Sequence, residues 1–147
     1  MSEYRHEWLC SEIVDKAQDA IILADREGVI RLWNPAAEAV FGYRAEEAVG
    51  QTLDLIIPER LRARHWSGYR NAMSTGTTRY ANRVLAVPAI RKDGTSISVE
   101  FTIALLSEST GTLLGPAAIV RDVTARWEEE RALKKRLAAL EVKTPEG

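Results

Sequence analysis

The chain has 147 residues, of which 46% are hydrophobic and 28% are charged, as in a single soluble globular domain. Its formal net charge of −1 argues against non-specific binding to nucleic acid and against binding to an anionic membrane surface. The single cysteine, Cys10, excludes an intramolecular disulfide and a multi-cysteine metal site, and is typical of a reducing compartment.

The first residues are polar and mixed in charge, so they do not have the pattern of a secretory signal peptide. No apolar stretch approaches the roughly 20 residues that a membrane-spanning helix needs. We therefore expect a cytoplasmic protein. Residues 1–57 carry 5 basic and 11 acidic side chains, whereas residues 58–147 carry 15 and 10. These halves could attract each other within a monomer or across a dimer, or the charges could form an ordinary solvated surface.

The N-terminal part is expected to contain one helix and one hairpin. Hydrophobic spacing predicts an amphipathic helix over residues 3–18. Two short apolar segments, 20–24 and 29–33, flank an acidic tetrad that ends in glycine, which is the pattern of a β-hairpin.

Helical segments are expected to follow this hairpin. Asn34 is a favourable N-cap for a helix that ends at Gly42. Residues 44–57 are expected to form short helical turns and a loop. A longer helix is predicted to begin at Pro58 and to run through Met73.

The remainder is predicted to be mostly sheet. Strands are expected over residues 80–91, 95–106 and 112–122, and Pro88 places the first of them at an edge or a bulge. A final helix follows. This order predicts an α+β fold, a five-stranded antiparallel sheet with helices on one face and a helix at each end of the chain. The expected division is an N-terminal amphipathic helix, a core, and a C-terminal signalling helix with its tail, over residues 1–18, 19–123 and 124–147.

Several motifs resemble those of the PAS family of sensor domains, and they occur along the chain in the same order as in that family. The similar segments are residues 20–43, 46–50, 91–94 and 121–124. The resemblance covers residues 10–126 and implies a pocket between the sheet and the helices. The family binds haem, flavins, small acids, lipids or no ligand. The light sensors of this family that bind flavin carry a reactive cysteine on the helix after the first hairpin. The corresponding residues in this chain, 34–42, contain no cysteine.

The helix after Pro58 is similar to the proximal-histidine helix of bacterial oxygen-sensing haem–PAS kinases. There a histidine six residues after the Glu of a Pro-Glu pair ligates the iron, and Glu59 and His65 have this spacing. His65 also lies on a helix face of apolar and small residues, which suits a flat macrocycle. The resemblance implies haem b, with His65 as axial ligand and metal site, and a diatomic gas as signal. The alternative is that His65 packs or forms hydrogen bonds within the fold, without haem.

Other pocket residues follow from the same comparison. Trp66 and Tyr69 lie beside His65, and either contact the cofactor or belong to the core. Arg83 lies near the position where the haem sensors carry an arginine that responds to the bound gas. The strand residues expected to line the pocket are Leu85, Ile103, Leu105 and Ile119.

The end of the chain is expected to carry the signal onward. Asp122 and Thr124 form the predicted hinge between the last strand and the last helix. Leu133, Leu137 and Leu140 then form a short coiled-coil-like seam, too short to be stable alone. We therefore expect a homodimer through the flanking helices.

The sequence predicts a signal-sensing module in which ligand binding shifts the population between two packings. The rival hypothesis is a ligand-free module for dimerisation or protein interaction. No phosphate-binding loop, nucleophile elbow or His-Glu-x-x-His motif is present, so we expect no enzymatic activity. No nucleic acid and no membrane are expected as partners. The output is expected to lie in a partner protein or in another part of a longer chain.

Overall fold

The computed structural model describes residues 4–78 and 83–143. In chain order its elements are α1 (His6–Lys16), β1 (Ala20–Ala24), β2 (Ile30–Trp33), α2 (Pro35–Phe41), α3 (Ala45–Ala48), the 3₁₀ helix η1 (Leu53–Ile56), α4 (Glu59–Thr75), β3 (Leu85–Ile90), β4 (Ser96–Ser107), β5 (Leu113–Asp122) and α5 (Thr124–Lys143).

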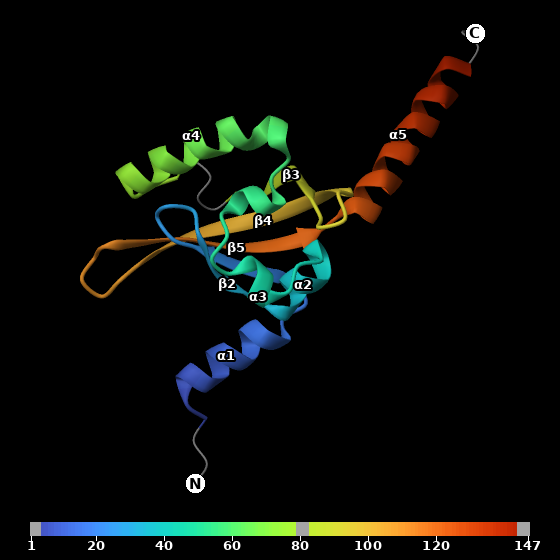
Figure 1. Cartoon of the computed structure of the whole chain (residues 1–147). Coiled ribbons are helices and arrows are strands. Elements are labelled where there is room, and N and C mark those ends of the chain that lie inside the picture. The colour runs from blue at the N-terminus through green and yellow to red at the C-terminus, as the bar shows by residue number, and fades with distance from the viewer. Residues whose placement is uncertain (1–3, 79–82, 144–147) are drawn as a thin grey trace.

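The strands form one five-stranded antiparallel sheet in the order β2-β1-β5-β4-β3. Figure 1 shows α2, α3 and α4 against this sheet, while α1 and α5 extend from it in different directions. The predicted α+β fold with flanking helices is therefore confirmed. Pro88 lies in β3, an edge strand, where its missing N–H group costs least.

The strand predicted over residues 80–91 is shorter in the structure. β3 spans Leu85–Ile90, and residues 79–82 lie outside the described part of the chain. The helical turns expected over residues 44–57 correspond to α3 and η1. No helix in the described ranges is long and apolar enough to cross a membrane.

The core lies between the inner face of the sheet and the short helices. Because directly opposite residues on paired strands share a face, Ile22, Ala118 and Ile103 point to the same side of the sheet. The buried residues that form the core cluster are Ala20, Ile22, Ile30, Trp33, Ala37, Phe41, Ala48, Ala89, Ile97, Val99 and Val120. The sheet therefore has one face packed against α2 and α3, and an outer face free of them.

Asn34 joins four segments of the fold. Its Oδ1 accepts hydrogen bonds from the N–H groups of Ala37, at 3.0 Å, and Ile21, at 2.8 Å, so the predicted N-cap is confirmed. Its Nδ2 also donates to the carbonyl oxygens of Val14, at 2.8 Å, and Asp19, at 3.1 Å. The side chain is only 2% exposed, and these four bonds satisfy its amide fully. Asn34 thereby fixes the end of α1 to the start of the sheet.

Candidate functional site

Helix α4 lies over the β1–β2 hairpin (Figure 1). Its inner face carries both apolar and polar side chains. It begins after Pro58 with Glu59 in its first turn and ends at Gly76, whose φ of 72° is left-handed. The side chains on its inner face are Leu61, Arg62, His65, Trp66, Tyr69, Ala72 and Met73. The residues between them, including Gly68, are exposed.

His65 is half-buried in an aromatic environment. The centroid of its ring lies 4.7 Å from that of Trp66 and 5.6 Å from that of Tyr69. Its Nδ1 is buried and has no hydrogen-bond partner among the described residues. Burial lowers the pKa of His65 below its ordinary value, although the nearby carboxylate of Asp54 opposes this effect. The neutral imidazole is therefore favoured, which is the form that binds metals.

Trp66 fixes α4 to two other segments. Its Nε1 donates a hydrogen bond of 2.7 Å to Oδ1 of Asp54 in η1. Its ring lies against Gly28 in the hairpin, where a Cβ would stand 2.2 Å from Cη2 of the ring. Both contacts position the helix.

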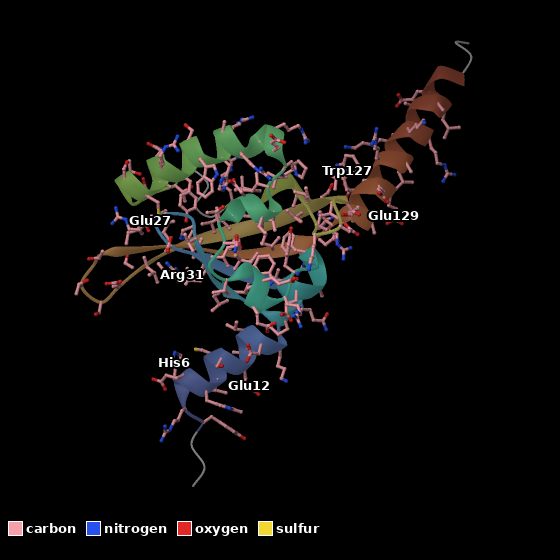
Figure 2. The ribbon with its side chains drawn as sticks, in the orientation of Figure 1. His6, Glu12, Glu27, Arg31, Trp127 and Glu129 are labelled. Carbon is pink, nitrogen blue, oxygen red and sulfur yellow. The ribbon has the colours of Figure 1, made fainter. Side chains whose placement is uncertain are left out.

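Tyr69 forms a second attachment between α4 and the hairpin. Its hydroxyl donates a hydrogen bond to the carbonyl oxygen of Asp25, and the residue is only 8% exposed. Burial raises the pKa of the phenol well above its ordinary value, so it remains a protonated donor. Figure 2 labels Glu27 and Arg31 on the hairpin to which Trp66 and Tyr69 bind.

The sheet contributes a half-buried apolar surface. Leu85, Ile103 and Leu105 lie on the inner face, because Leu85 is opposite Phe101 and Ile103 is opposite Ala118. Ile119 does not join them. It pairs with Thr102 and Ile21 on the outer face and is 49% exposed, so the structure corrects its expected place in a common pocket wall. Pleating puts neighbouring residues of β5 on opposite faces.

Arg83 lies in the segment before β3 and is exposed. The structure thus brings His65, Trp66 and Tyr69 together on α4, and Leu85, Ile103 and Leu105 together on the sheet. The sequence did not predict Asp54 or Gly28 as partners of Trp66. Gly28 was recognisable as a turn residue, but no local pattern marks either residue as a contact of α4.

The junction between β5 and α5 is tied to β4. Oγ1 of Thr124 accepts a hydrogen bond of 2.9 Å from the N–H of Ser98 and lies 2.6 Å from Oδ1 of Asp122, to which it donates. That same Oδ1 accepts from the N–H of Thr124 at 2.9 Å. Asp122 and Thr124 therefore form one connected network with β4, and Ser98 is a member that the sequence did not predict.

The sequence and the fold of this chain are both similar to those of known proteins. A sequence profile described as the PAS fold matches residues 14–128 of the chain. The chain belongs to the PAS family. The solved PAS domain of a protein from Colwellia psychrerythraea has the same fold, with a TM-score of 0.68 and 23% identity, and the match covers 80% of this chain and 96% of that one.

Two relatives of this PAS domain have named roles. The signal transduction histidine-protein kinase AtoS of Escherichia coli is 32% identical over 130 residues, which are 87% of this chain and 20% of the kinase. The oxygen sensor protein DosP of Escherichia coli is 26% identical over 120 residues, which are 82% of this chain and 15% of that protein. The chain thus spans a fifth or less of each relative and is similar to a module within them.

Proposed function

We propose that this PAS domain is the sensory module of a signal-transduction protein. It takes up a small ligand between α4 and the inner face of β3 and β4, and passes the change to α5. The best candidate ligand is haem b with a diatomic gas. The similarity to a sensor kinase and to an oxygen sensor supports the sensory role.

The buried, unpartnered Nδ1 of His65 carries this proposal. A buried polar nitrogen without a partner costs about 1–3 kcal/mol, so native proteins rarely retain one without a reason. Burial also keeps the imidazole neutral and able to ligate a metal. Among the described residues no three His, Cys, Asp or Glu side chains form a metal site, so His65 would be the one protein ligand of a metal that the macrocycle itself holds.

Half-buried apolar side chains on the inner face of the sheet would suit a macrocycle bound beside α4. Leu85, Ile103 and Leu105 would supply apolar contacts from the sheet. Trp66 and Tyr69 are engaged with η1 and the hairpin, so their role is to orient the helix that carries His65. When bound, haem would supply the iron that takes up the gas.

The signal would leave through the sheet. β4 carries Ile103 and Leu105 at the proposed ligand surface, and Ser98 and Glu100 near its other end. Ser98 binds Thr124, and Glu100 accepts a hydrogen bond from Arg126 of α5. A ligand that binds two arrangements of β4 unequally would therefore change the attachment of α5.

An absorption spectrum tests the haem assignment. The protein expressed with haem supply should show a Soret band that is lost or shifted in His65→Ala. His6→Ala is the matched control, because His6 is the other histidine and lies on the exposed helix α1, and it should leave the band unchanged. Absence of the band in the unaltered protein would exclude haem, and a band unaffected by His65→Ala would exclude His65 as its ligand.

A second candidate function is a ligand-free dimerisation or interaction module, and the exposed apolar side chains of the flanking helices favour it. The large exposed hydrophobic residues on α1 and α5 are Trp8, Leu9, Ile13, Trp127, Leu133, Leu137 and Leu140. We propose a homodimer through these helices. Sedimentation of the chain with residues 126–147 deleted tests the contribution of α5, and an unchanged dimeric mass would show that α5 does not hold the dimer.

A further inference from the structure

Helix α1 carries a histidine and the single cysteine of the chain on one side of its first two turns. His6 and Cys10 are four residues apart, and this spacing brings two side chains onto the same helix face. Sγ of Cys10 lies 3.5 Å from Nε2 of His6, and both residues are exposed. Figure 2 labels His6 on the part of α1 that extends away from the sheet. Two side chains that can bind metal ions therefore lie side by side at the surface.

The distance between these two atoms is the one that a tetrahedral metal ion requires of its ligands. Zinc binds thiolate sulfur at about 2.3 Å and imidazole nitrogen at about 2.0–2.1 Å. With a tetrahedral angle between the two bonds, the sulfur and the nitrogen stand about 3.5–3.6 Å apart. Because the two atoms are already 3.5 Å apart, one ion could bind both with only small rotations of the two side chains.

Neither side chain is engaged elsewhere in the fold. Within residues 4–78 and 83–143, the thiol of Cys10 and the imidazole of His6 form a hydrogen bond only with each other. Such a contact at the surface adds little to stability, because water offers both groups equivalent hydrogen bonds. The contact therefore contributes little to the fold and leaves both groups accessible to an ion from solvent.

The chemistry of the two groups selects the kind of ion. Thiolate is a soft ligand that favours zinc over magnesium and calcium, and imidazole also suits zinc. The surrounding charge favours a cation as well, because residues 1–57 carry 11 acidic and 5 basic side chains. No cluster of three His, Cys, Asp or Glu side chains occurs in the described part of the chain, so two water molecules would complete a tetrahedral zinc site.

We propose that His6 and Cys10 form a two-ligand zinc site on the surface of α1. Nε2 of His6 gives its lone pair to the ion while the ring proton resides on Nδ1. Cys10 binds as the thiolate, and its proton passes to solvent. The site uses no residue of α4 or of the sheet. It is therefore independent of the proposed sensory function and of haem, and the tests of the two proposals fail separately.

Zinc bound at this position stabilises the free half of α1. The helix has 11 residues and no buried side chain, and Asn34 holds only its far end, at Val14. A helix of this length is marginally stable without packing. Because the ion can bridge His6 and Cys10 only while the first two turns are helical, binding favours the helix over its frayed form. The helix that precedes the sheet thereby responds to zinc.

Cobalt(II), a spectroscopic probe for zinc sites, tests the two ligands. The reduced full-length chain should show a near-ultraviolet thiolate-to-cobalt charge-transfer band, which zinc removes and magnesium does not. Cys10→Ser should lack this band. The matched control is Arg5→His with His6→Arg, which keeps composition and charge but places the histidine before the helix, five residues from Cys10. This control should bind zinc at least about tenfold more weakly, because the chelate is lost. Equal zinc affinity in the control and the unaltered chain, or no band in the unaltered chain, would overturn the proposal.

Hydrogen exchange tests the effect of zinc on α1. With free zinc at about ten times its dissociation constant, the amides of residues 9–13 should exchange about tenfold more slowly, because protection grows with the ratio of free zinc to that constant. Helix α2, which Asn34 caps, should be unaffected. Arg5→His with His6→Arg should show no slowing at the same zinc concentration. Unchanged exchange in the unaltered chain, or equal slowing in both chains, would contradict the stabilisation of α1 by the bound ion.

Discussion

The indole ring of Trp66 lies directly against Gly28, so that residue 28 has no room for a Cβ atom. This contact joins α4 to the β1–β2 hairpin, and the hydrogen bond from Trp66 to Asp54 joins the same side chain to η1. The position of His65, one residue earlier, therefore depends on a glycine in a turn that is distant in the sequence.

Gly28→Ala should destabilise the domain strongly. The new Cβ would collide with Trp66, and the backbone φ of +82° is itself unfavourable for alanine. We expect the free energy of unfolding to fall by about 2–4 kcal/mol in urea titrations, from the combined conformational and steric costs. Gly50→Ala is the control, because Gly50 has a φ of +98° but nothing within 4 Å of the added atom. Gly50→Ala should lower the free energy of unfolding by about 1–2 kcal/mol. An equal loss of stability in Gly28→Ala and Gly50→Ala would argue against the Trp66 contact.

Asn34→Asp should loosen α1. The carboxylate keeps the acceptor for Ala37 and Ile21 but has no N–H to donate to the carbonyl oxygens of Val14 and Asp19. Burying this unpaired charge should cost about 2–4 kcal/mol of unfolding free energy. Hydrogen exchange should show faster exchange in α1 than in α2, whose cap survives. Equal acceleration in both helices would contradict this role.

Acidification should weaken the fold through His65. The pKa of His65 in the folded chain lies below 6.5, its ordinary value, because burial disfavours the imidazolium. Between these two values the unfolded chain binds more protons, so the free energy of unfolding falls as the pH falls through this window.

Urea titrations at pH 7.5 and 5.5 measure this contribution. The loss of stability between the two conditions should be smaller in His65→Gln than in the unaltered chain. His6→Gln controls for the exposed histidine. If His65→Gln shows the full pH dependence, another group is responsible.

Thr124→Val should detach the start of α5 from β4. Valine keeps the shape of threonine but cannot accept the hydrogen bond from Ser98 or donate to Asp122. We expect a loss of about 1–2 kcal/mol in unfolding free energy and faster hydrogen exchange in the first turn of α5. Thr102→Val, on the exposed outer face of β4, is the control and should change stability little. Unchanged exchange at the junction in Thr124→Val would argue against its part in signal relay.

Much of this fold could be predicted from local patterns. The Asn34 cap, the glycine end of α2 and the alternation in β4 each depend on a few neighbouring residues, and the structure has all three. The missing N–H group of Pro88 predicted an edge strand or a bulge, and the structure places Pro88 in the edge strand β3. The order of these elements also supported the family resemblance, which the sequence comparison confirmed.

The faces of β5 could not be assigned in the same way. Its sequence is apolar at adjacent positions, so alternation does not show which residues point inward. Pairing with β1 and β4 places Val120 in the core and Ile119 outside. The prediction that Ile119 lines the pocket together with Leu85, Ile103 and Leu105 is therefore wrong.

Sequence by itself determined that this chain is one PAS domain with helical ends, because caps, turns and strand alternation are local. Only the tertiary structure decided what holds His65 in place. Trp66 reaches Asp54 across 12 residues and Tyr69 reaches Asp25 across 44, and no periodic pattern encodes such contacts. The residues of α4 form a specific site only when the chain folds α4 onto the hairpin, since that packing buries the imidazole of His65.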